Sequence, residues 1–341
     1  MRQRRRLGAV ALTAVCWLAW TVGAATAEDT EQSLYAAAKR EGKVVVWTPL
    51  EIAFYQKIAA SFARRYPGLQ IEPFRIQPGP AIERLVAEAR AGQVNVDVID
   101  PNIAYLPILF ERGLIVPYPW SKVFGIDPQR TLFDSRALVL GHYDLPIGYN
   151  TTLVGAGDIK SWDDLTDPKW RGKLLLEPRG FALGILAAKW GKDRVLAYIK
   201  RLMDNHPILT KGAQSTAEAL ADGQGAVAIG AYAARLVLFK EAGAPVDWAR
   251  VGPVPAQQVA IAPIKGGPHP NAAKLLAAYW AGAEAQQIFY DEQRYGMVGY
   301  YLSPRGTELK QRGLEVVLET TDIDTDRHNL EVVGRAIGGM K

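Results

Sequence analysis

Apolar and polar positions alternate with two different periods in the first third of the chain. The segments 44–47, 70–76 and 96–99 are short apolar or alternating runs, which are typical of strands. Residues 52–66 and 81–91, which lie between them, place their apolar side chains along one helical stripe. Strands that alternate with amphipathic helices favour a parallel, doubly wound α/β unit.

A second unit of the same kind begins near Thr151. Apolar runs at 174–176 and 226–229 predict buried strands, and the residues after each run predict helices, at 180–190 and 232–242 respectively. The chain is therefore expected to cross between two units twice, near residues 141–150 and again near 251–263. A pair of crossing strands predicts a hinge.

The first residues have the pattern of an export signal. Four arginines, without any acid, precede an apolar stretch from Leu7 to Gly23, and Ala25-Thr26-Ala27 is a typical cleavage site. We therefore expect residues 1–27 to be removed and the protein to work in the periplasm. The only cysteine, Cys16, would leave with this segment, so the mature protein is expected to contain neither a disulfide nor a reactive thiol.

Removal of this segment also changes the charge of the chain. The 40 Lys and Arg residues of the full sequence face 35 Asp and Glu residues, and four of the arginines belong to the signal. The mature chain is therefore nearly neutral, which gives no support for nucleic-acid binding. No phosphate-loop, dinucleotide or nucleophile-elbow motif is present, and so no cofactor and no catalytic residue is predicted.

Four stretches of the sequence resemble one protein family. Residues 146–154 read Pro-Ile-Gly-Tyr-Asn-Thr-Thr-Leu-Val, and residues 161–177 read Ser-Trp-Asp-Asp-Leu-Thr-Asp-Pro-Lys-Trp-Arg-Gly-Lys-Leu-Leu-Leu-Glu. Together with residues 34–47 and the late helices from Pro270 onward, they resemble bacterial extracellular solute-binding proteins of ABC importers. The closest subgroup is the ferric-iron, putrescine and thiamine type.

The resemblance implies the fold and the function. It implies an α/β, two-lobed periplasmic-binding-protein (Venus flytrap) fold, in which two doubly wound lobes are joined by crossing hinge strands. The expected division is a signal peptide (1–27), a first lobe (28–145 and 256–290), a second lobe (146–255) and a C-terminal helical segment on the second lobe (291–341). The implied function is capture of a small solute between the lobes and delivery to a membrane permease, without catalysis.

Candidate ligand contacts lie where strands end, because α/β sheets bind ligands at the carboxyl ends of their strands. Arg179 and Gly180 lie at a strand–helix junction, where a forked cation and free N–H groups suit an oxyanion. Ser215 and Thr216 have the spacing of a second helix start. The remaining candidates are Thr48 and Asn102 in the first lobe, Tyr149 and Asn150 at the crossing, and Tyr232 after a strand. This set predicts an anionic ligand.

One position in the sequence, after the predicted strand 226–229, bears on direct binding of ferric iron. The resemblance implies that iron-binding members carry two adjacent tyrosines after the strand 226–229, but this chain has only Tyr232 there. We interpret the pair Tyr300-Tyr301 as packing residues, and the four histidines are too scattered to form a metal site. No metal site is predicted, although iron held as a carboxylate chelate remains open.

Two other functions remain open from the sequence alone. The first is a ligand-sensing periplasmic protein that docks on a membrane receptor instead of a permease. The second is a secreted enzyme on the same fold, which would need an acid–base pair or a nucleophile that the sequence does not show. For all three functions we expect the protein to be a monomer.

Overall fold

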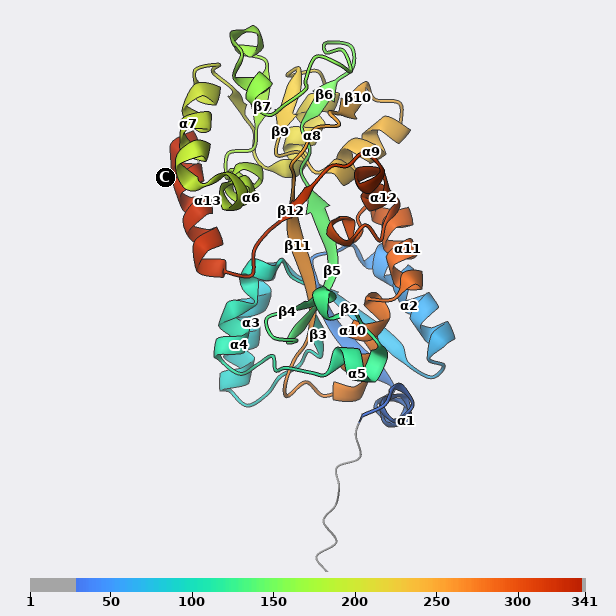
Figure 1. Cartoon of the computed structure of the whole chain (residues 1–341). Helices are drawn as coiled ribbons and strands as arrows, with labels where there is room; N and C mark the ends of the chain where they lie inside the picture. The colour runs from blue at the N-terminus through green and yellow to red at the C-terminus, as the bar shows by residue number, and fades with distance from the viewer. Residues whose placement is uncertain (1–28, 339–341) are drawn as a thin grey trace, which may run out of the picture.

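The computed structural model describes residues 29–338, so the predicted signal peptide lies outside the described residues. Two sheets form two lobes, one above the other in Figure 1. This arrangement confirms the predicted two-lobed α/β fold. Among the described residues, no helix combines the length and the apolar composition needed to cross a bilayer.

The first lobe is built on a seven-stranded sheet with the order β2-β1-β3-β11-β5-β4, and β12 pairs with β11. The strands are β1 (Lys43–Thr48), β2 (Gln70–Arg75), β3 (Val98–Ile99), β4 (Thr131–Leu132), β5 (Ala137–Asp144), β11 (Val254–Pro263) and β12 (Val316–Leu318). The strands β1, β2 and β3 are parallel, whereas β11 is antiparallel to β3 and β5. The sheet is therefore mixed, because β11 returns from the second lobe.

Helices cover both faces of this sheet and bury two apolar cores. They are α1 (Glu31–Glu41), α2 (Ile52–Arg65), α3 (Pro78–Arg90), α4 (Pro107–Glu111), α5 (Trp120–Phe124), α10 (Pro270–Trp280) and α11 (Ala283–Gln293). The stripe predicted on residues 52–66 is buried, since Tyr55, Ile58 and Phe62 are all in the core.

The second lobe has a five-stranded sheet with the order β10-β6-β9-β7-β8. Its strands are β6 (Gly148–Asn150), β7 (Leu174–Leu176), β8 (Ile208–Leu209), β9 (Val227–Ile229) and β10 (Val246–Trp248). Its helices are α6 (Phe181–Trp190), α7 (Lys192–Met203), α8 (Ala213–Ala221) and α9 (Ala233–Glu241). The triplet Leu174–Leu176 is fully buried, as its uninterrupted apolar run predicts.

Strand directions determine which loops face the space between the lobes. The hinge strands β5 and β11 pair in antiparallel register from Ala256–Asp144 to Ile261–Leu138, and β5 leads up to β6. Because β3 is antiparallel to β11, its carboxyl end points toward the second lobe. Because β7 and β9 are oriented opposite to β6, their carboxyl ends point back toward the first lobe. The two sets of strand ends therefore face each other across a cleft.

The C-terminal segment divides between the two lobes. Strand β12 joins the first sheet beside β11, and the helix α12 (Pro304–Gln311) follows the short 3₁₀ turn Val298–Tyr300 near the hinge. Helix α13 (Ile323–Ile337) packs on α6 and α7 of the second lobe. The prediction that residues 291–341 lie on the second lobe is therefore wrong for β12, whose pairing with β11 could not be recognised from its sequence. The other lobe boundaries stay a prediction.

Candidate functional site

A polar pocket lies at the carboxyl ends of the second-lobe strands. It is an open pocket with a volume of about 330 Å³, and it brings together three of the predicted residues, Arg179, Ser215 and Tyr232. We call it the anion pocket, and it is lined by Arg179, Lys211, Gly212, Ala213, Gln214, Ser215, Glu218 and Tyr232. Helix α8 and the two residues before it supply six of these residues, and β7 and β9 lead to the others.

Arg179 is oriented by a buried carboxylate. Its Nε donates to Oε1 of Glu177 over 2.7 Å, and the Glu177 side chain is only 1% exposed whereas that of Arg179 is 49% exposed. The guanidinium also stacks over the ring of Phe181, 4.5 Å from its centroid. Since Nε is the atom that Glu177 holds, the two terminal nitrogens remain available to a ligand as a fork.

The start of α8 is open to the same pocket. The helix begins after Gly212, which has φ 152° and provides no side-chain cap. A side chain at Gly212 would place a Cβ atom 3.1 Å from Nη2 of Arg179, so glycine permits the guanidinium to lie against the start of the helix. The first N–H groups of a helix lack intrahelical partners, and an anion is stabilised there. Lys211 adds a second cation beside them.

This geometry corrects two details of the prediction. Ser215 and Thr216 lie inside the first turn of α8 and not ahead of it, and each hydroxyl donates to the carbonyl of Gly212. Thr216 is fully buried. The start of α6 is also not free, because the Glu177 carboxylate accepts from the N–H of Phe181 over 3.4 Å.

Gly180 has a packing role. A Cβ atom at this position would lie 2.4 Å from Cγ1 of Val333 in α13, and the backbone has φ 72°, which favours glycine. The residue allows α13 to lie against the start of α6. The structure therefore places Gly180 away from the ligand space.

Tyr232 connects the pocket to the hinge. Its hydroxyl donates to Oε1 of Gln257 in β11 over 3.1 Å. Its ring packs against Tyr143 of β5, with the centroids 5.3 Å apart, and against Tyr295, which follows α11. Burial raises the pKa of Tyr232 to about 12, although nearby Arg179 acts in the opposite direction. The phenol is therefore neutral and acts as a hydrogen-bonding group.

Tyr149 and Asn150 lie in β6, whose carboxyl end points away from the first lobe. Strand β6 is antiparallel to β9, so Asn150 lies beside Ala226, at the start of β9, while Tyr232 follows its end. The Asn150 amide donates to the Leu220 carbonyl and accepts from Thr152. The expectation that these two residues face the ligand is therefore not met, since strand direction carries them away from the cleft.

The first-lobe candidates face the cleft but already have partners. Thr48 is fully buried and donates to Asp100 over 2.9 Å. Tyr55 also donates to Asp100, whose other carboxylate oxygen is buried without a partner. Asn102 donates to Glu319 over 2.9 Å and caps the following 3₁₀ turn, Ile103–Tyr105. Glu319 lies more than 200 residues away, so no sequence signal could have indicated this pairing.

The buried carboxyl of Asp100 gives a prediction for pH. Burial raises its pKa to about 7, and the hydrogen bonds from Tyr55 and Thr48 offset this only partly. Because the pKa is raised on folding, the folded state binds the proton more tightly, and stability is lost as the pH rises through 7. Asp100→Asn should remove this loss. Between pH 6.5 and 8, the difference in unfolding free energy between the two proteins should change by about 1 kcal/mol.

Urea unfolding at each pH measures this difference. Comparison with the parent protein cancels the contributions of Glu319, whose pKa burial raises to about 7, and of His142, whose pKa burial lowers to about 4. Asp134→Asn is the control, because its side chain is 93% exposed. A difference that does not vary with pH would contradict the prediction.

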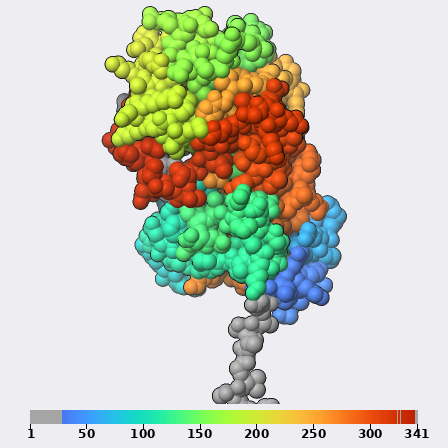
Figure 2. All heavy atoms as spheres, in the orientation of Figure 1, coloured from blue at the N-terminus to red at the C-terminus, as the bar shows by residue number. Residues whose placement is uncertain are grey.

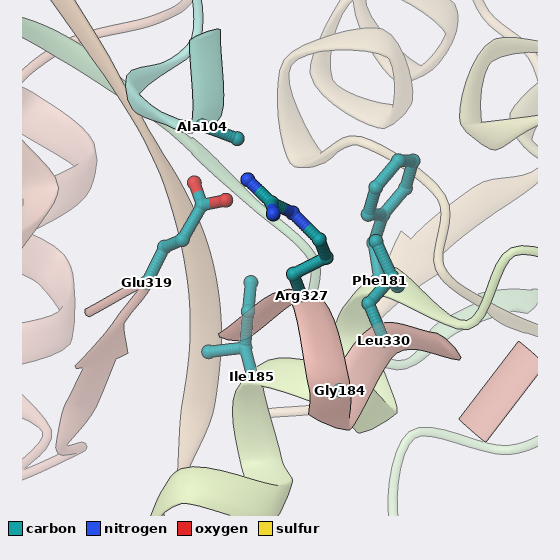
Figure 3. Close-up of a pocket in the computed structure, with 7 residues that line it drawn as sticks. All are labelled: Ala104, Phe181, Gly184, Ile185, Glu319, Arg327 and Leu330. Carbon is teal, nitrogen blue, oxygen red and sulfur yellow. The ribbon is translucent and has the colours of Figure 1, made fainter. Parts of the chain in front are cut away.

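A second pocket lies where α6 and α13 meet the first lobe. We call it the apolar pocket, and it is lined by Ala104, Phe181, Gly184, Ile185, Glu319, Arg327 and Leu330. Its cavity volume is about 110 Å³. In Figure 3 the carboxylate of Glu319 and the guanidinium of Arg327 point toward one another across an otherwise apolar wall. Only the tertiary structure reveals this pocket, since its walls come from distant parts of the chain.

Metal-binding groups are not clustered in the described part of the chain. Within residues 29–338, no three side chains of the types His, Cys, Asp and Glu lie close enough to hold a metal ion. Of the predicted packing pair, Tyr300 donates its hydroxyl to the carbonyl of Gln129, and Tyr301 packs with Val298 and Leu309.

Comparison with solved structures gives the same fold with different ligands. An iron- and citrate-bound protein from Trichodesmium has a TM-score of 0.70 and 16% identity, covering 86% of this chain and 99% of that one. Iron-bound HitA from Pseudomonas aeruginosa has a TM-score of 0.70 and 16% identity over 87% and 99%. AfuA from Actinobacillus pleuropneumoniae, with fructose-6-phosphate bound, has a TM-score of 0.61 and 21% identity over 87% and 97%.

Sequence comparison identifies the family. A Haemophilus influenzae protein described as uncharacterized is 24% identical over 281 residues, which is 75% of this chain and 78% of that protein. The family model described as "Bacterial extracellular solute-binding protein" matches residues 57–298, which is more than half of the chain. The chain therefore belongs to the bacterial extracellular solute-binding proteins, the periplasmic components that deliver solutes to ABC importers.

Proposed function

We propose that this solute-binding protein captures a small anionic solute between its lobes, with the anion pocket as the primary contact. The observation that supports this proposal most directly is the convergence of Arg179, Lys211 and the uncapped start of α8 on one open space. A guanidinium fork, an ammonium group and helix N–H groups are all donors that favour an oxyanion. Glu218, the one acid in the pocket, accepts from Gln214.

Hinge closure would follow from contacts to both lobes. Tyr232 lines the anion pocket and donates to Gln257 of the hinge strand β11, so a ligand that touches this ring contacts a residue that is hydrogen-bonded to the hinge. An open–closed equilibrium moves from 1:99 to 99:1 with about 5.5 kcal/mol of differential binding. A few charge-assisted hydrogen bonds of about 1.5–3 kcal/mol each are sufficient.

The central test is calorimetry with methylphosphonate and inorganic phosphate as probes. Arg179→Gln should weaken binding by about 1.5–3 kcal/mol, or roughly 10–150-fold, because a charged hydrogen-bond donor is lost. Lys211→Ala should weaken binding as well, without disturbing Glu177, and therefore separates ligand contact from folding. Arg201→Ala is the control, since Arg201 belongs to the same lobe but pairs with Asp163 outside the pocket. Unchanged affinity in both pocket variants would contradict the proposal.

Iron is proposed to bind, if at all, as a carboxylate chelate. Tyr232 is a single phenol with a raised pKa, whereas Fe(III) favours phenolate and carboxylate oxygens. The anion pocket suits the carboxylates of a chelator better than the bare ion. Loading with ferric citrate, compared with ferric ion and citrate given separately, distinguishes these forms.

We further propose that the protein is a monomeric carrier without enzymatic activity and that it serves a permease and not a receptor. Recovery of each probe unchanged after incubation tests the first part, and capture of the cognate permease from membranes tests the second. Residues 1–27 are proposed to direct export, so the exported protein should begin at Glu28.

A further inference from the structure

The two pockets share one wall. Phe181 lines the apolar pocket, and the guanidinium of Arg179, which lines the anion pocket, lies 4.5 Å from the centroid of its ring. Arg179 and Phe181 flank Gly180, the residue that precedes α6. A ligand whose charged group lies at Arg179 therefore has an apolar surface directly beside it.

The apolar pocket belongs to the cleft between the lobes. Ala104 comes from the first lobe, Phe181 and Ile185 come from α6 of the second lobe, and Leu330 comes from α13. In Figure 2 the C-terminal segment, in red, lies between the yellow-green second lobe and the teal first lobe, with a hollow at their meeting point. Movement of one lobe toward the other would therefore enclose whatever occupies this pocket.

The charges of the apolar pocket do not favour a second anion. Oε2 of Glu319 accepts from Asn102 and from the N–H of Gln258, which fixes a carboxylate at the first-lobe side. Arg327 of α13 faces this carboxylate, and its Nη1 lies 3.8 Å from Oδ1 of Asp324. The opposite charges of Glu319 and Arg327 balance, and the rest of the lining is apolar. The anion pocket has two cations, Arg179 and Lys211, against one acid in its lining, so the charged end of an anionic ligand is attracted there more strongly.

We propose that the solute is an amphipathic organic anion, with its oxyanion in the anion pocket and an apolar body in the apolar pocket, beside Phe181 and Leu330. This inference rests on the proposed function, and it adds the chemical class of the ligand. A bare inorganic anion or a polyhydroxylated one leaves the apolar walls without a partner.

Calorimetry with two matched phosphonates tests the proposal. Methylphosphonate and 2-phenylethylphosphonate carry the same charged group, but only the second has an apolar body. The phenylethyl compound should bind at least about tenfold more tightly, because burial of an aromatic ring is favourable. Leu330→Ser should reduce this advantage by about threefold or more and leave methylphosphonate binding unchanged. Ala104→Gln, at an exposed position, should reduce the phenylethyl advantage in the same way. It keeps the test valid if Leu330→Ser folds poorly.

Leu153→Ser is the matched control, since Leu153 is an exposed leucine of the second lobe that lies in neither pocket. Equal affinity for the two phosphonates, or a phenylethyl advantage that survives both variants, would overturn the inference. Loss of methylphosphonate binding in Arg179→Gln would still support the anion pocket in that case. If neither phosphonate binds, the proposed function fails together with the inference.

Discussion

Arg305→Met is expected to lower the free energy of unfolding by about 3–5 kcal/mol. Arg305 is only 5% exposed, and its Nε donates to Asp144, which is 4% exposed, over 3.1 Å. Its Nη1 donates to Glu308 over 2.6 Å, and its guanidinium lies 5.0 Å from the centroid of the Trp248 ring. Asp144 ends the hinge strand β5 and Trp248 belongs to β10, so one side chain ties α12 to the hinge and to the second lobe.

The size of this effect follows from Asp144, which stays buried when its partner Arg305 is removed. Burial raises the pKa of Asp144, and Arg305 partly offsets that increase. Without Arg305, a buried carboxylate loses its counter-charge or must take up a proton, and either outcome costs stability. Urea unfolding followed by circular dichroism measures the change. The double variant Asp144→Asn, Arg305→Met should recover part of the loss, because it leaves no buried charge.

Arg312→Ala provides the control for this prediction. Arg312 also pairs with Glu308, over 3.2 Å, but its side chain is 49% exposed. Exposed ion pairs contribute little, so this variant should lie within about 0.5 kcal/mol of the parent protein. Similar losses in Arg305→Met and Arg312→Ala would show that burial is not the cause.

Gly180→Ala is expected to lower the free energy of unfolding by about 2–4 kcal/mol, as the sum of backbone strain and overpacking. The added Cβ atom would lie 2.4 Å from Cγ1 of Val333 and 3.0 Å from Cδ1 of Ile337, on a backbone with φ 72°. Val333 is branched at Cβ and buried, so α13 itself must move. Because α13 carries Leu330, binding of 2-phenylethylphosphonate should weaken as well.

Gly184→Ala is a matched control on the same helix. Gly184 also faces α13, but its added Cβ atom would lie 3.5 Å from the nearest atoms of Leu330, which is ordinary contact, and its φ is not positive. Alanine favours a helix interior by about 1 kcal/mol over glycine, so this variant should be neutral or slightly stabilised. Equal destabilisation by both alanines would argue against the close approach at Gly180.

Local sequence signals locate strand ends, and therefore the position of residues that follow them, but the role of these residues in ligand binding stays a prediction. Arg179 and Tyr232 follow β7 and β9, and both strands end at the cleft, so topology alone places them at the pocket. Asn150 also ends a strand, but β6 is oriented the other way. A short apolar run does not reveal its direction, and for this reason the same rule failed for Asn150.

Competition between side chains was the second reason why the sequence did not predict the site in full. The start of α6 was expected to be open, but Glu177 occupies it and holds Arg179 at the same time. The start of α8, at Gly212, is the open one, although Ser215 and Thr216 imitate the spacing of a cap. Capping patterns describe which bonds are possible, whereas the packing of the two strand ends decides which bonds form.

The sequence by itself determined the alternation of strands and helices, the two crossings and the family, because each depends on the spacing of neighbouring residues. The tertiary structure alone decided which strand ends meet, why Asn102 pairs with Glu319, and how Leu330 and Phe181 come to line one pocket. These features depend on strand direction and on the docking of α13 against α6, which join residues more than 100 positions apart. Such contacts leave no period in the sequence, since any apolar helix face would satisfy the same local pattern.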